Sequence, residues 1–96
     1  MADAVHELLV TEVGLTKLGA RGISAEESAQ VPRNCHVVVR NPHAGANPGR
    51  RRLLIGATDG GRWLTLVIEQ TMEPTTWLIV TGWSATPAER RIMANR

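Results

Sequence analysis

Hydrophobic positions in the second half of the chain recur as β-branched runs or alternate with polar positions, a pattern typical of β-strands. Four segments have this pattern: residues 35–40, 51–57, 62–70 and 77–83. The connection Asp59-Gly60-Gly61 suits a hairpin, because glycine tolerates the positive φ angles of tight turns. Since the connections are short, we expect a four-stranded antiparallel meander.

The first third of the chain has the signals of two short helices. Thr11 can cap a helix that runs to about Ala20, with Gly22 as its stop. Ser24 begins a second helix, because Glu27 three residues later completes a capping box. This helix ends by residue 31, ahead of a proline.

The two ends of the chain complete the predicted fold. Residues 6–10 fit either a short strand or the lead-in to a helix. Thr86-Pro87-Ala88-Glu89 is a helix start with a capping box and proline at the first position, and the helix runs through Met93. We expect a single α+β domain over residues 1–96: a four-stranded antiparallel meander, two N-terminal helices and one C-terminal helix. The loop 41–50, with two Asn-Pro pairs, is expected to be exposed.

Hairpin pairing assigns the strand residues to two faces of the sheet. The face expected to pack against the helices contains Val38, Leu53, Ile55, Leu64, Leu66, Ile68, Trp77 and Ile79. The opposite face is more mixed, is expected to be an open working surface, and contains Cys35, Val37, Val39, Arg52, Leu54, Trp63, Thr65, Val67, Glu69, Leu78 and Val80.

Composition narrows the classes of protein. With 43% hydrophobic and 21% charged residues, the 96-residue chain is an ordinary globular domain. No apolar run approaches the roughly 20 residues of a membrane helix, so we expect no membrane partner. The single cysteine, Cys35, excludes an internal disulfide and a multi-cysteine metal site, and favours a cytoplasmic location. The first ten residues contain Asp3 and Glu7 and lack the basic lead-in of a secretory signal. We expect no metal and no cofactor.

Charge is distributed unevenly along the chain. The net charge of +2 divides into −3 over residues 1–31, +5 over residues 32–62 and zero over residues 63–96. Ten of the eleven cationic residues are arginine, whose planar guanidinium suits bidentate contact with phosphate. The middle third is therefore expected to attract a phosphate backbone or an acidic protein surface.

Three short motifs, in this order and spacing, resemble the BrnT toxins of type II toxin–antitoxin systems. They are LGARGISAEE at residues 18–27, the hairpin RLLIGATDGGRWLTLV at residues 52–67, and TGWSATPAERR at residues 81–91. Arg21 occupies a position where the family commonly has histidine, and Trp83 one where it commonly has arginine.

The resemblance implies a RelE-like ribonuclease fold, with the helices on one side of a small antiparallel sheet. It also implies a toxin that cleaves RNA and inhibits translation, together with a BrnA-like antitoxin as partner, in a homo-oligomer or a toxin–antitoxin hetero-oligomer. The alternative is a catalytically inactive module on the same fold that contacts a protein or a nucleic acid through its basic hairpin.

Metal-free RNA cleavage requires a base, an acid and a cation that stabilises the charge of the phosphorane. Arg52 and Arg62 are the predicted charge stabilisers, and Glu69 and His36 are the candidates for the base or the acid, without an assignment of one role to each. The alternatives are an arginine partner for Glu69 and a half-buried position at the sheet edge for His36. His43 is a further candidate in the loop, and Glu89 is assigned to its capping box.

The predicted RNA-binding residues are Arg40, Arg50, Arg51, Arg90 and Trp63. Arg50, Arg51 and Arg52 lie in the same hairpin as Arg62, so we expect their guanidinium groups to converge on one phosphate. The other interpretation is a solvated basic strand edge that deters aggregation. Trp63 and Trp83 are candidates for stacking on a base of single-stranded RNA, whereas Trp77 is expected in the core.

Overall fold

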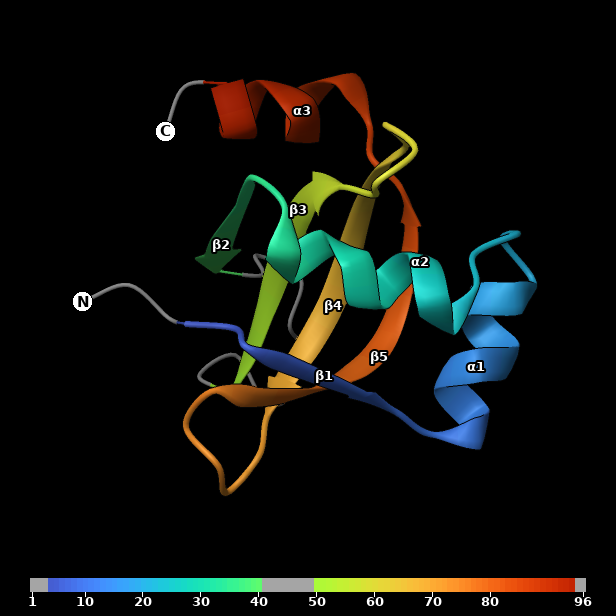
Figure 1. Cartoon of the computed structure of the whole chain (residues 1–96), viewed down its shortest axis with the longest axis vertical. Coiled ribbons are helices and arrows are strands. Elements are labelled where there is room, and N and C mark those ends of the chain that lie inside the picture. Colours follow the sequence, from blue (N-terminus) through green and yellow to red (C-terminus); the bar gives the residue numbers. More distant parts are fainter. Residues whose placement is uncertain (1–3, 41–49, 95–96) are drawn as a thin grey trace.

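The computed structural model describes residues 4–40 and 50–94, drawn in colour in Figure 1. The elements in chain order are β1 (Glu7–Val10), α1 (Glu12–Gly19), α2 (Ala25–Gln30), the 3-10 turn η1 (Val31–Arg33), β2 (His36–Arg40), β3 (Arg51–Ala57), β4 (Trp63–Gln70), β5 (Thr76–Ser84) and α3 (Pro87–Ala94). The four predicted strands and three predicted helices are all present, with ends within two residues of those expected. The predicted loop, including His43, lies outside the described residues except for Arg50.

The sheet has five strands in the order β1-β5-β4-β3-β2. Strands β2 to β5 form the predicted antiparallel meander, and β1 pairs in parallel with β5, with Glu7 opposite Thr76. The α+β class is confirmed, but the prediction of a four-stranded, purely antiparallel sheet was wrong. Of the two interpretations of residues 6–10, the short strand is confirmed as β1. Its pairing with β5 was not predicted, because the two strands lie at opposite ends of the chain.

The helix ends follow the predicted capping chemistry. The Thr11 hydroxyl accepts a hydrogen bond from the backbone N–H of Gly14 at 3.0 Å, and Ser24 and Glu27 form a complete capping box. Gly22 ends the first helix with a φ of 71°, a left-handed conformation that glycine adopts without strain. No helix among the described residues is long and apolar enough to cross a membrane.

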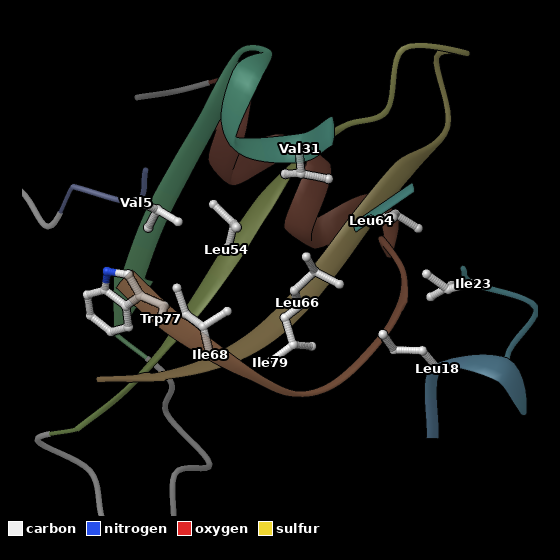
Figure 2. Packing of buried hydrophobic residues seen from close by; sticks show 10 residues of the cluster. All are labelled: Val5, Leu18, Ile23, Val31, Leu54, Leu64, Leu66, Ile68, Trp77 and Ile79. Carbon is white, nitrogen blue, oxygen red and sulfur yellow. The ribbon is translucent and has the colours of Figure 1, made fainter. Parts of the chain in front are cut away.

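The helices cover both faces of the sheet. On the face that we call the α2 face, Leu18, Ile23 and Val31 from the helical segments pack with sheet residues, as Figure 2 shows. The sheet residues of this core include Leu54, Leu64, Leu66, Ile68, Trp77 and Ile79. On the opposite face, the α3 face, Met93 of α3 packs with Leu53, Ile55 and Val67. The expectation of helices on one side only was therefore wrong, and the face expected to be open is partly covered.

The residues on the two faces of β3 are exchanged relative to the prediction. Leu54 lies on the α2 face, and Leu53 and Ile55 lie on the α3 face. The cause is the length of the turn between β3 and β4. Ala57 pairs with Trp63, so the five residues 58–62 separate the strands and Leu54, not Leu53 or Ile55, lies opposite Leu66. A one-residue difference in register exchanges the two faces of a strand. Arg52 therefore lies on the α2 face, whereas Glu69 and Thr65 lie on the α3 face.

Candidate nucleic-acid interface

Arg62, a predicted catalytic residue, holds the fold together at the start of β4. Its guanidinium donates to the carbonyl oxygen of Gly22 at 2.8 Å and pairs with the carboxylate of Glu27 at 3.3 Å. It also donates to the Arg21 carbonyl at 3.4 Å and to the Ser84 hydroxyl at 3.3 Å. One side chain therefore joins the end of α1, the capping box of α2, the β3–β4 turn and β5.

The three motifs at residues 18–27, 52–67 and 81–91 meet at Arg62. Their spacing along the chain thus has a structural explanation that does not depend on catalysis. Arg62 lies at the opposite end of the β3–β4 hairpin from Arg52, whose partner Ile68 is six residues, or about 20 Å, from Arg62 at the usual rise per residue of a strand. The predicted convergence of Arg62 with Arg50, Arg51 and Arg52 on one phosphate is therefore wrong.

The remaining hairpin arginines lie where β2 ends and β3 begins, and they divide between the two faces. Arg40 and Arg52 are partners in the β2–β3 register, on the α2 face. Arg52 Nη1 donates to the backbone carbonyl of Arg51 at 2.9 Å. Arg50 is exposed and donates to the carbonyl of Gln70 at 3.4 Å.

Arg51 and Glu69 are two predicted site residues that form an ion pair. They are partners in the β3–β4 register, and Arg51 Nε lies 3.0 Å from Glu69 Oε1. Both side chains project from the α3 face and are mostly buried, with 33% and 24% of their side-chain surface exposed. A carboxylate beside a guanidinium has the chemistry of a base next to a phosphate-binding group, and also that of a structural ion pair.

His36 lies apart from these residues. It is half-buried on the α2 face, where Nδ1 donates to the carbonyl of Asn34 at 2.9 Å. Its cross-strand partner is Gly56, and it is four residues, or about 13 Å, from Arg40. Glu69 lies on the other face, so the structure does not bring the predicted base and acid together.

Two tryptophans on the α3 face each have an arginine over the ring. The Arg90 guanidinium lies 5.6 Å from the ring centre of Trp63, and that of Arg21 lies 5.9 Å from the ring centre of Trp83. These distances are typical of cation–π contacts. Trp83 lies opposite Thr65, which is two residues along β4 from Trp63, so the two indoles are diagonal neighbours on one face. We call Arg21, Trp63, Trp83 and Arg90 the tryptophan–arginine patch.

Glu89 fixes the position of Trp83 and of α3. Its Oε1 accepts from the indole N–H of Trp83 at 3.0 Å, from the Thr65 hydroxyl at 2.9 Å and from the Thr86 backbone N–H at 2.8 Å. The predicted capping box with Thr86 is present. Burial alone would raise the pKa of Glu89, but the hydrogen bonds from Thr86, Trp83 and Thr65 outweigh it and lower the pKa. The patch therefore lies over an ionised carboxylate, and both of its oxygen atoms accept hydrogen bonds within the protein.

The carboxylates of Glu27 and Glu89 predict a loss of stability in acid. The Ser24 backbone N–H, with Arg62, lowers the pKa of Glu27 below 4.5, and that of Glu89 is lowered too. A lowered pKa in the folded state adds stability above the unfolded-state pKa, and that stability is lost as the pH falls through the folded-state value. We expect the melting temperature to hold from neutral pH to about pH 5 and to fall below it. A Glu27→Gln, Glu89→Gln variant should melt lower at neutral pH and lose less on acidification; an equal loss in both proteins would contradict this prediction.

Within residues 4–40 and 50–94, no three His, Cys, Asp or Glu side chains gather as metal ligands do. Comparison with protein-family models, curated proteins and solved structures finds no match for this chain. The evidence for function is therefore the arrangement of side chains described above.

Three of the four patch residues had been given a role in RNA binding: Trp63 and Arg90 as RNA-binding residues, and Trp83 as a candidate for stacking on a base. Arg90 and Trp63 were expected to bind RNA, and the structure brings them together. Arg21 was not assigned a role, because its contact with Trp83 joins residues from opposite ends of the chain. The one available signal was that Arg21 and Trp83 are the two positions at which the motifs depart from the BrnT pattern; in the structure these two residues touch.

Proposed function

We propose that the protein binds single-stranded RNA through the tryptophan–arginine patch. The observation that carries this proposal is the pair of Trp–Arg contacts on neighbouring strands, at 5.6 and 5.9 Å. Aromatic rings and guanidinium planes are the surfaces on which unpaired bases stack, and guanidinium also binds phosphate. Arg21 and Arg90 are exposed, and Trp63 and Trp83 are partly exposed, so a base can reach the patch without unfolding of the chain.

This proposal predicts that Arg90→Ala and Arg21→Ala each weaken RNA binding about three- to tenfold, because each removes one cation and one stacking surface. The measurement is fluorescence anisotropy of a labelled single-stranded RNA in a salt series. Affinity should fall with rising salt, and the slope should be smaller in each variant. Arg91→Ala, an equal loss of charge at the next residue of α3, is the control and should change affinity by less than about twofold. Equal affinities in all four proteins would exclude the patch.

A second candidate is the endoribonuclease toxin that the BrnT resemblance implies. It is favoured by the Arg51–Glu69 pair, which places a carboxylate 3.0 Å from a guanidinium on the same sheet face as the patch. In this proposal Glu69 removes the proton of the 2′-hydroxyl, and the 2′-oxygen attacks phosphorus to form a 2′,3′-cyclic phosphate. The bond from phosphorus to the 5′-oxygen breaks, and the leaving 5′-oxygen takes a proton from water. Arg51 stabilises the negative charge on the phosphorane oxygens. The RelE-like description of the fold and the BrnA-like antitoxin partner belong to the same proposal.

The nuclease proposal predicts RNA breakdown and growth arrest on expression. Glu69→Gln should reduce cleavage about 10²- to 10⁴-fold, the usual contribution of a general base. Glu73→Gln, in the exposed β4–β5 connection, is the control. If RNA binds but stays intact at high protein concentration, the nuclease proposal is excluded and the proposal of a non-catalytic RNA-binding module is retained. Cleavage at the same rate by the Glu69→Gln variant would remove Glu69 from the mechanism.

A further inference from the structure

We propose that two copies of the chain associate by antiparallel pairing of their β2 strands. In the described part of the chain, β2 is an edge of the sheet and pairs with β3 alone. Its five residues, His36–Arg40, are in unbroken register with β3 and contain no proline, lysine or bulge, the usual devices that protect an edge. The backbone groups on the outer side of such a strand are available to another strand.

The valine side chains of β2 remain partly exposed to solvent in the single chain. Val38 packs beside the core of the α2 face, and Val37 and Val39 pack beside the core of the α3 face, yet all three are only half-buried. A strand added to this edge would cover valine side chains on both faces. The pairing would thus extend two existing cores instead of creating a new one.

The sequence of β2 is complementary to itself under a two-fold axis. An axis perpendicular to the sheet at Val38 places Val38 opposite the partner's Val38 on the α2 face. The same axis places Val37 opposite the partner's Val39 on the α3 face. The same axis places His36 opposite the partner's Arg40. Each dimer then contains two such histidine–arginine pairs.

The tautomer of His36 fits this arrangement. Nδ1 contacts the carbonyl oxygen of Asn34, which can only accept, so Nδ1 carries the proton and Nε2 of the neutral ring is an acceptor. The partner's Arg40 guanidinium can donate to that nitrogen. The charged groups on neighbouring elements are Arg33 of η1, paired with Asp59 of the β3–β4 turn at 3.5 Å, and Arg52 beside Arg40. None of these supplies a carboxylate that could replace the neutral imidazole as a partner for Arg40.

The test is sedimentation of the full chain over a concentration series from roughly ten micromolar to one millimolar. One added strand pair buries well under about 1,200 Å², so the association should be weak. The wild-type protein should form dimers within this series. Arg40→Glu should weaken the association about three- to tenfold, because a carboxylate cannot donate a hydrogen bond to Nε2 of the partner's His36.

Arg91→Glu, the same change of charge on α3, is the matched control and should keep the wild-type dimer affinity. Hydrogen exchange at high and low protein concentration identifies the edge, with protection expected to increase at residues 36–40. A monomer throughout the series would overturn the proposal, as would protection at β1 in place of β2. A dimer affinity that Arg40→Glu leaves unchanged would overturn the proposed pairing.

Discussion

Replacing Arg62 by alanine should lower the free energy of unfolding by about 2–3 kcal/mol, because several hydrogen bonds from a charged, two-thirds buried group are lost together. The lost contacts join α1, α2 and β5 to the β3–β4 hairpin. For a chain of 96 residues this corresponds to a fall in melting temperature of about 10–20 °C. Thermal and urea unfolding measure both quantities.

Lysine at this position should recover little of the loss, since its single ammonium group cannot contact Gly22, Glu27 and Ser84 at once. Arg91→Ala removes an exposed arginine and should change stability by no more than about 0.5 kcal/mol. The same series separates structure from catalysis at Arg62. Unchanged stability in Arg62→Ala, together with a loss of RNA cleavage, would contradict the structural role and restore the catalytic one.

A second large effect is expected at Gly56, where β3 passes under η1. A Cβ atom there would lie 2.9 Å from Cβ of His36, 2.9 Å from Cγ1 of Val31 and 3.0 Å from the carbonyl oxygen of Cys35. These neighbours belong to the backbone or to the rigid beginnings of side chains, so relief requires movement of η1 away from the sheet. Gly56→Ala should therefore destabilise the fold by about 1–3 kcal/mol, measured by urea unfolding.

Gly19→Ala is the matched control for Gly56→Ala. A Cβ atom at Gly19 meets no atom within 4 Å, and the residue is the last of α1. Alanine should stabilise the protein there by up to about 1 kcal/mol, because it has the higher helix propensity. The same substitution should thus have opposite signs at the two glycines. Equal effects would show that η1 does not pack on β3 as described.

Local chemistry was the part of the fold that could be predicted from sequence. The capping boxes at Ser24 and Thr86 were recognisable because each depends on two residues three positions apart. The antiparallel meander was recognisable because its strands are joined by short connections. The parallel pairing of β1 with β5 was not, because the two strands lie at opposite ends of the chain.

The site was harder to predict, because its contacts are long-range and register-dependent. The face of Arg52 depended on the number of residues in one turn, which a sequence containing two adjacent glycines leaves open. Arg62 was expected at a phosphate, whereas its partners Gly22 and Glu27 lie 40 and 35 residues earlier in the chain. Four arginines in one hairpin therefore indicated a charged region correctly, but not which of them would serve the fold.

The arginines have different contacts in the structure, and these contacts change the chemistry that is expected of the protein. Arg62 serves the fold and Arg51 is paired with Glu69, while Arg21 and Arg90 lie over indole rings at the surface. An arginine that contacts an aromatic ring loses less side-chain entropy when a base stacks on it than a freely moving arginine would. This arrangement favours binding of unpaired bases over the concentrated positive charge that was expected in the hairpin.

The three indole N–H signals in an NMR titration with single-stranded RNA test the proposed interface most directly. Trp77 is buried, and its N–H donates to the carbonyl of Ala4 at 3.0 Å, so it provides an internal control. If RNA binds at the tryptophan–arginine patch, the signals of Trp63 and Trp83 should move or broaden with added RNA while that of Trp77 stays in place. If RNA binds and all three indole signals stay unchanged, the patch is not the interface.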